Sequence, residues 1–166
     1  KVKGIFYILQ SIPLLTNRES CFFTFVGSGD DFDEAEKIAR ETGIMNSVQF
    51  TGYIQDEECD HFYANTDALV FPTYDTEGFP MALFKSVALG MPVITTKIRA
   101  AKDYLTEPDN VIWVKEQSAQ AIAAAVDRLI TDTELRKNMS KNNCELGKEF
   151  TAENVCKQMH DVFAIL

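Results

Sequence analysis

The sequence predicts an α/β domain built on a doubly wound parallel sheet, with extra helices after the last strand. Short segments rich in β-branched and aromatic residues alternate with longer segments of helical periodicity. The short segments are almost wholly apolar and lack alternation with polar residues, which is typical of strands buried on both faces. A repeated strand–helix order joins parallel strands through crossover helices.

The strands are expected at 21–26 (CFFTFV), 47–50 (SVQF), 68–71 (ALVF), 92–95 (PVIT) and 111–114 (VIWV). The helices between them are expected to begin near Ile5, Asp31, Asp56, Phe79 and Ile98. Because the strand segments are nearly all apolar and do not alternate, we expect helices on both sides of the sheet. Trp113, in the fifth strand segment, is expected to lie in the core.

Only helices are expected after the fifth strand. Ser118 opens the first of them, and Thr131 with Glu134 has the spacing of a capping box for the second. Thr151 begins a final amphipathic helix. No repeat or interdomain linker interrupts the 166 residues, so they are interpreted as a single domain.

Composition excludes several classes of function. The net charge of −9, from 25 acidic and 16 basic residues, leaves no basic footprint for nucleic acid. No apolar run approaches the roughly 20 residues of a membrane-spanning helix. Four cysteines, Cys21, Cys59, Cys144 and Cys156, lack the spacing of a zinc site, and we interpret them as reduced thiols of a cytoplasmic protein.

The segment 71–96 carries the chemistry. A strand expected to end at Phe71 is followed by a polar loop containing Glu77 and Gly78. Pro80 stands where a helix would begin and Gly90 where it would end, which is the usual punctuation of a helix. Ligands of open parallel sheets bind outside the carboxyl ends of the strands, and this places Glu77 at the expected crevice.

The start of this helix could bind an anion, because the N–H groups of Met81 and Ala82 would face a diphosphate. Spacing alone leaves plainer alternatives open. Glu77 could simply cap the helix, and Lys85 could be a solvated surface residue. Similarly, Gly27 and Gly29 could only shape a turn, Tyr53 could be a packed surface aromatic, and Lys3 could be an exposed terminal residue.

These residues lie within motifs that resemble those of retaining glycosyltransferases of the family 4 type, which have the two-domain GT-B architecture. The family signature E-G-F-x-x-x-x-x-E, followed by G-x-P-V-[IV], resembles EGFPMALFK, ALG and MPVI. FVGSG resembles the family's V-G-x-G turn, and KVKG resembles the end of its R-x-x-x-x-x-K-G segment. VQFTGYIQDEE and FYANTDALVFPT resemble the stretch from the base-binding loop to the strand before the signature.

The resemblance implies a role for each matched residue. Glu77 would hold hydroxyls of the transferred sugar and is the candidate catalytic residue. The candidate substrate-binding residues are Lys3 at the diphosphate, Gly27 and Gly29 at the glycine turn, Tyr53 and Ile54 at the nucleobase, Gly78, Phe79, Met81 and Ala82 along the sugar and diphosphate, and Lys85. No metal and no cofactor is implied, since the nucleotide diphosphate sugar is itself the donor substrate.

Two departures from the family pattern stand out. The second signature glutamate is replaced by Lys85, whose ammonium offers donors but no acceptor to a ribose hydroxyl. The family also has a strand and an arginine before the position of Lys3. We therefore expect residues 1–166 to be a fragment that lacks its first strand and an N-terminal acceptor domain. Loss of an interior strand exposes sheet edges, so self-association of the fragment is expected.

The resemblance thus implies the donor-binding half of an enzyme that transfers a sugar, with retention, to a glycan or lipid-linked acceptor held by the missing domain. A cytoplasmic protein, peripheral to the inner membrane face, is expected. Two alternatives are kept: a non-catalytic module that has lost tight donor binding, for which Lys85 is the best argument, and a sugar-nucleotide epimerase domain. The fold alone would not separate them.

Overall fold

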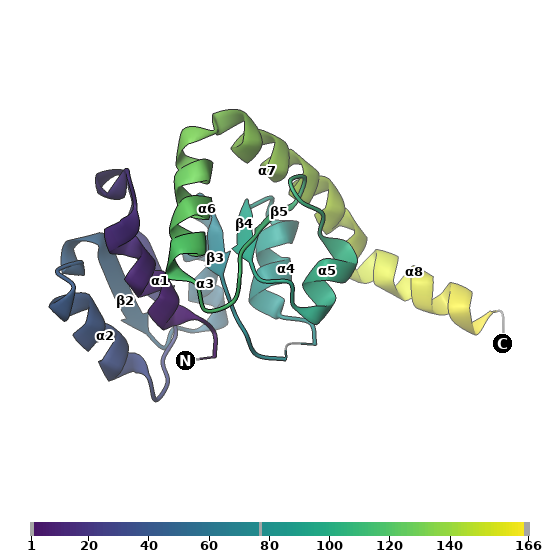
Figure 1. The fold of residues 1–166 in the computed structure, drawn as a ribbon. Helices are drawn as coiled ribbons and strands as arrows, with labels where there is room; N and C mark the ends of the chain where they lie inside the picture. The colour runs from purple at the N-terminus through teal and green to yellow at the C-terminus, as the bar shows by residue number, and fades with distance from the viewer. Residues whose placement is uncertain (1, 77, 165–166) are drawn as a thin grey trace.

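The computed structural model describes residues 2–76 and 78–164, in which strands and helices alternate as expected (Figure 1). The strands are β1 Phe23–Val26, β2 Val48–Gly52, β3 Leu69–Phe71, β4 Val93–Thr95 and β5 Val111–Trp113. The helices are α1 Ile5–Ser11, α2 Phe32–Glu41, α3 Asp56–Ala64, α4 Met81–Ala88, α5 Arg99–Tyr104, α6 Ala119–Thr131, α7 Thr133–Gly147 and α8 Ala152–Phe163. Each strand starts within two residues of its expected position.

Every strand pairing is parallel, which confirms the expected fold class. The strands form two hydrogen-bonded groups, β1–β2 and β3–β4–β5. In the described residues no backbone ladder joins β1 to β3, yet side chains from both strands meet in one core. Phe25 of β1 and Val70 of β3 both pack against the cluster that contains Ile8 and Ile122.

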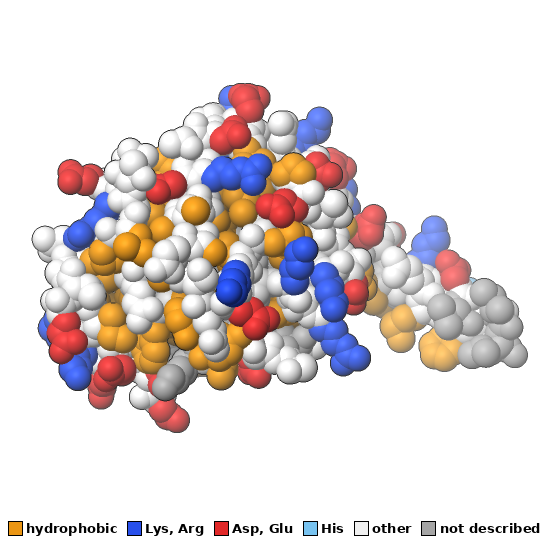
Figure 2. Space-filling view, in the orientation of Figure 1, with side chains coloured by type: hydrophobic (Ala, Val, Ile, Leu, Met, Phe, Trp, Pro, Cys, Tyr) orange, Lys and Arg blue, Asp and Glu red, His pale blue; other side chains and the backbone are white. Residues whose placement is uncertain are grey.

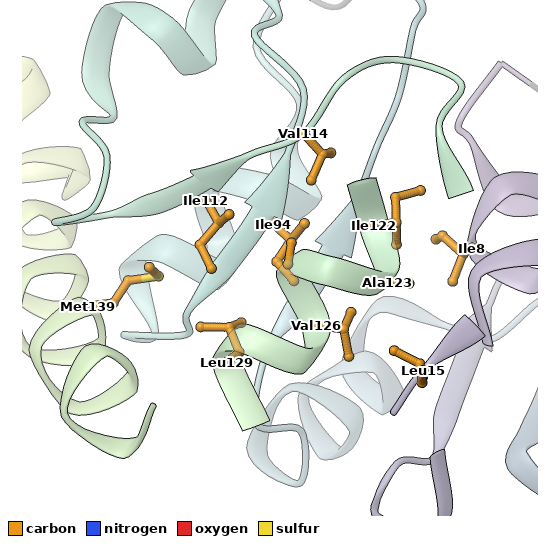
Figure 3. Packing of buried hydrophobic residues seen from close by; sticks show 11 residues of the cluster. Ile8, Leu15, Ile94, Ile112, Val114, Ile122, Ala123, Val126, Leu129 and Met139 are labelled. Carbon is orange, nitrogen blue, oxygen red and sulfur yellow. The ribbon is translucent and has the colours of Figure 1, made fainter. Parts of the chain in front are cut away.

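Consecutive residues of the central strand face opposite layers, as the pleat requires. Ile94 of β4 packs with Ile112 of β5 against helix α6, where Ile122 and Val126 lie (Figure 3). Its neighbour Val93 belongs to a second cluster, formed with α4 and α5 on the other face. All three residues of β4 are buried, so this strand is the centre of the described sheet.

The helix ends confirm two of the local sequence predictions and contradict a third. The Ser118 hydroxyl accepts a hydrogen bond from the N–H of Ala121 and caps α6 as expected. Gly90 follows α4 with φ 75°, the left-handed conformation that favours glycine after a helix. The expected capping box of Thr131 and Glu134 is wrong: Thr131 is the last residue of α6, and the Asp132 carboxylate caps α7 instead.

Helix α7 is fixed to the rest of the domain by a buried amide. Asn143 is fully buried; its Nδ2 donates to the carbonyls of Met91 (2.7 Å) and Asn110 (3.0 Å), and its Oδ1 accepts from Asn110 Nδ2 (3.0 Å). One turn later, Gly147 lies against Ala88 of α4, where a Cβ would meet the Ala88 Cα at 2.5 Å. Helix α7 thereby holds α4, whose first turn faces the candidate site.

Helix α8 leaves the domain and extends away from it at the C-terminal end of the described chain (Figure 1). Exposed hydrophobic side chains lie on this extension (Figure 2). Val155, Met159 and Phe163 are among the exposed residues of α8. Within residues 2–76 and 78–164, no helix has the length and apolar character needed to cross a membrane.

Candidate functional site

The loops after β1 and β2 lie side by side at the carboxyl ends of these strands. The N–H of Gly27 donates to the carbonyl of Gly52 over 3.0 Å, which brings the Gly27–Gly29 turn next to the loop that holds Tyr53 and Ile54. Gly27 and Gly29 have φ values of 125° and 156°, and a Cβ at either position would have no atom within 4 Å. The turn therefore offers open backbone to a ligand.

Tyr53 and Ile54 differ in their surroundings. The Tyr53 side chain is 78% exposed, so it is not the packed surface aromatic that spacing alone allowed. Ile54 is partly buried at the start of the segment that leads into α3. A capping box follows, in which Glu58 accepts from the Gln55 N–H (3.3 Å). The sequence interpretation missed this cap, although glutamine and glutamate three residues apart have its spacing.

The N-terminal segment is anchored beside the loop after β3. The carbonyl of Val2 accepts from the N–H of Tyr74 (3.0 Å) and the hydroxyl of Thr73 (3.2 Å). The Lys3 ammonium lies 3.9 Å from the Asp75 carboxylate. Lys3 is therefore held at the carboxyl end of β3, next to the loop that joins β3 to α4, and is not merely a solvated terminal residue. We call this loop the signature loop, because it contains the start of the family signature.

Gly4 explains why this segment can lie so close. Its φ is 80°, and a Cβ at this position would overlap the carbonyl group of Pro72. Only glycine meets both requirements without strain. The Lys3-Gly4 pair thus places a cation and the start of α1 against the loop that follows β3.

The signature loop ends in a group of packed aromatic rings. Phe79 is 46% exposed and stacks on Phe84 of α4, with ring centroids 3.9 Å apart and planes 7° from parallel. Tyr104 of α5 and Phe150, near the start of α8, meet both rings edge to face. This packing fixes the Phe79 ring, and with it the backbone of its exposed neighbour Gly78, relative to α4.

The first turn of α4 presents free donors. Pro80 is the N-cap residue rather than the first helical residue, and its carbonyl accepts from the N–H groups of Leu83 and Phe84. The N–H groups of Met81 and Ala82 have no acceptor among the described residues. Both residues are exposed, with Met81 at 71%. Free N–H groups at a helix N-terminus attract anions.

Lys85 is paired with helix α3. Its Nζ lies 2.6 Å from Asp60 Oδ1 and 4.9 Å from the centre of the Tyr63 ring. The hydrogen bond to Asp60 raises the pKa of the Lys85 ammonium, which therefore stays charged at neutral pH. Burial raises the pKa of Tyr63, against the opposing effect of the nearby Lys85. Sequence reasoning missed Asp60 and Tyr63, because acids and tyrosines at these spacings usually belong to a solvated helix face.

Glu77, the candidate catalytic residue, lies outside the described residues. Of the other predicted site residues, all lie at carboxyl ends of strands or on the helices that follow them. They form two groups: Lys3, Gly78, Phe79, Met81 and Ala82 around the loop after β3, and Gly27, Gly29, Tyr53 and Ile54 after β1 and β2. The Lys85–Asp60 pair connects the helices of the two groups. In the described residues, no three His, Cys, Asp or Glu side chains gather as a metal site would require.

Residues 1–145 match the family described as glycosyl transferases group 1, and the chain belongs to this family. An uncharacterized glycosyltransferase of Methanocaldococcus jannaschii is 26% identical over 164 residues, covering 98% of this chain and 42% of the relative. A capsular polysaccharide biosynthesis glycosyltransferase of Staphylococcus aureus is 29% identical over 168 residues, covering 98% and 43%. The chain thus spans less than half the length of these relatives.

Solved structures agree with the fold. The chain matches Anabaena HepE in complex with UDP with a TM-score of 0.88 at 18% identity, covering 99% of this chain and 46% of that one. It matches the C-terminal domain of LpcC, a glycosyl transferase group 1 family protein from Francisella tularensis, with a TM-score of 0.79 at 26% identity, covering 90% and 80%. The fold is that of the C-terminal half of a GT-B glycosyltransferase.

Proposed function

We propose that this chain binds a nucleotide diphosphate sugar and forms the donor half of a retaining, family 4-type glycosyltransferase. One observation carries the proposal. Open glycine backbone, an exposed aromatic loop, the Lys3 cation and the free donors of α4 gather at the carboxyl ends of parallel strands. Crevices at this edge are where open α/β sheets bind nucleotides.

The diphosphate lies against the first turn of α4. The N–H groups of Met81 and Ala82 donate to its oxygens, and Lys3 adds a positive charge from the facing segment. When the bond to the sugar breaks, the nucleoside diphosphate takes the bonding electron pair and gains negative charge. The fixed N–H groups and Lys3 stabilise this charge more in the transition state than in the bound nucleotide sugar. Such differential binding accelerates transfer.

The nucleobase lies beside Tyr53 and Ile54, at the exposed loop after β2. We propose uridine as the base, because the structure of Anabaena HepE, which this fold resembles, was solved with UDP and with UDP-glucose. The glycine turn of Gly27 and Gly29 lies within the same group of loops, next to Gly52. Its open backbone lets a nucleotide approach without a side chain in the way.

The transferred sugar lies over the signature loop. We propose that Glu77 accepts hydrogen bonds from the sugar hydroxyls, and that Gly78 and Phe79 line the same pocket. The stacked Phe79 and Phe84 rings support this role, since they hold the loop in one conformation. No metal is required by the proposal, because backbone donors and Lys3 neutralise the diphosphate.

The acceptor is proposed to be a glycan or a lipid-linked sugar, held at the cytoplasmic membrane face by an N-terminal domain of the longer polypeptide. We further propose that a strand from that polypeptide stands between β1 and β3. Two facts support this: the two groups of strands share one core without sharing a ladder, and residues 2–4 run beside the carboxyl end of β3. A strand before Val2 would enter the sheet parallel to both neighbours.

A non-catalytic module is the second candidate, and the Lys85–Asp60 pair favours it. This lysine replaces the second glutamate of the family signature, and its ammonium is engaged by Asp60 over 2.6 Å. A donor site that lacks a carboxylate at this position loses one acceptor for a ribose hydroxyl. Tight donor binding separates the two candidates.

Calorimetric titration of the chain with UDP, GDP and ADP tests the proposal. We expect UDP to bind with at least about a tenfold preference, equivalent to about 1.4 kcal/mol. Sulfate at matched ionic strength is the control for non-specific binding to α4. Binding of all three nucleotides no stronger than sulfate would contradict donor binding and leave the non-catalytic module.

A further inference from the structure

A shallow hollow lies at the carboxyl ends of β4 and β5, outside the group of loops assigned to the donor. Its volume is about 350 Å³, and it is lined by Lys97, Trp113, Val114, Lys115 and Glu116. We refer to these five residues as the Trp113 pocket. Its volume is at the lower end of the 300–1,000 Å³ typical of small-molecule sites, which suits a single sugar unit.

Trp113 provides an aromatic surface in this pocket. It is the last residue of β5 and the sole tryptophan of the sequence, and it is only half-buried. The ring packs against the cluster of α4 and α5, while its pocket side meets the Lys97 ammonium, 6.0 Å from the ring centre. The exposed Lys97 side chain can move off this face, and the indole then offers a large, rigid contact to the C–H face of a sugar.

The pocket also carries uncompensated positive charge. Lys97 and Lys115 are exposed, and within the described residues neither forms an ion pair with a carboxylate. Glu116 is the one acid among the five lining residues. In a chain of net charge −9, two lysines without a carboxylate partner in the described residues, one of them over the Trp113 ring, favour an anionic ligand over a neutral one.

The pocket is next to the donor loops. The Thr96 hydroxyl donates to the carbonyl of Thr73, which joins the segment before Lys97 to the loop after β3. The N–H of Val114 donates to the carbonyl of Thr95 over 2.9 Å and holds the two pocket segments together. The Trp113 pocket therefore lies at the same edge of the sheet as the loop after β3, and hydrogen bonds join the segments that lead into the two.

We propose that the Trp113 pocket binds a sugar unit that carries a carboxylate or a phosphate. The sugar ring lies over the indole, and its negative charge lies between the ammonium groups of Lys97 and Lys115. In the proposed glycosyltransferase this unit belongs to an acidic acceptor glycan, of which the N-terminal domain holds the remainder. That assignment to the acceptor rests on the proposed function, whereas binding of the acidic sugar does not.

Fluorescence of Trp113 tests the inference, because no other tryptophan contributes to the signal. The chain, saturated with UDP to keep phosphates out of the donor site, is titrated with glucuronate, glucose 6-phosphate, methyl glucoside and inorganic phosphate. We expect both charged sugars to bind and to change the emission. Methyl glucoside and inorganic phosphate should bind at least about fivefold more weakly. A carboxylate-only or phosphate-only response identifies the charged group.

Two lysine substitutions distinguish binding in the Trp113 pocket from non-specific attraction to surface charge. Lys97→Gln should weaken the binding of both charged sugars by about three- to tenfold and leave the affinity for methyl glucoside unchanged. This is the effect expected from loss of one partly exposed charge contact. Lys102→Gln, an exposed lysine of α5 that does not line the pocket, is the matched control and should change nothing. Equal binding of charged and neutral sugars, or equal effects of both variants, would overturn the proposal.

A failure of the Trp113 pocket proposal can be distinguished from a failure of the proposed donor binding. UDP binding is measured by calorimetry in the same variants, and Lys97→Gln should leave it unchanged. Absence of UDP binding together with a charged-sugar response would contradict the donor proposal alone. UDP binding with no response to any sugar would contradict the Trp113 pocket alone.

Discussion

Replacing Asn143 by alanine should destabilise the domain strongly, because this buried amide joins helix α7 to the amino-terminal ends of β4 and β5. The substitution removes two donated hydrogen bonds, to Met91 and Asn110, and one accepted from Asn110. At about 1 kcal/mol net for each bond, the loss is about 3 kcal/mol. In a domain of this length, this corresponds to a fall of about 6–12 °C in the melting temperature.

Asn142→Ala is the matched control for this prediction. Asn142 is on the same helix, so both variants gain the same helix propensity, but its single bond to the Asp109 carbonyl is exposed. Its effect should stay within about 0.5 kcal/mol. Urea denaturation of both variants gives the free energies, provided that the slope with urea is unchanged. Equal losses in the two variants would refute the role assigned to the buried amide.

Three further predictions concern the helix packing, the signature position and the open sheet. Gly147→Ala should lower the melting temperature although alanine favours helix, because overlap with Ala88 outweighs a propensity gain of about 1 kcal/mol; a higher melting temperature would contradict the close contact. In an Asp60→Asn background, Lys85→Glu should strengthen UDP binding in calorimetry, since a carboxylate accepts from a ribose hydroxyl and an ammonium cannot; unchanged affinity would show that position 85 does not touch the nucleotide. Within the described residues one edge each of β1 and β3 pairs with no strand, and these edges should make the chain self-associate; a monodisperse monomer in light scattering would count against this.

The strands could be predicted closely because most of them are short, largely apolar segments between polar turns. Residues 93–95, 111 and 112 are buried, and their sequence lacks polar alternation for the same reason, whereas β1 alternates between partly buried and exposed residues. The cap of α7 was placed one residue early, because Thr131 and Asp132 are both good caps. The choice between them depends on where α6 ends, and this end is set by packing rather than by the local sequence.

The site was predictable at the level of loops but not of partners. Glycines with positive φ and the punctuation around α4 are local features, and the structure brings their loops to one edge of the sheet. The partner of Lys85 could not be predicted, since Asp60 is 25 residues away on another helix. Trp113 was expected to lie in the core; it packs against the core on one side, and its position at the end of β5 leaves the other side accessible.

A pair of substitutions at Met81 tests the central claim, that the first turn of α4 binds the diphosphate of the donor. Proline is well tolerated at the first position of a helix, and Pro80 already has the extended conformation that a following proline requires. Met81→Pro therefore removes one N–H donor with little effect on the fold, whereas Met81→Ala keeps that donor and loses only an exposed side chain.

Calorimetric titration of the two Met81 variants with UDP is the decisive measurement. Loss of one charge-assisted hydrogen bond should weaken UDP binding by about tenfold in Met81→Pro, while Met81→Ala binds like the parent chain. Unchanged melting temperatures would show that both variants are folded. Equal affinity of the two folded variants for UDP would contradict the claim that this helix N-terminus holds the diphosphate.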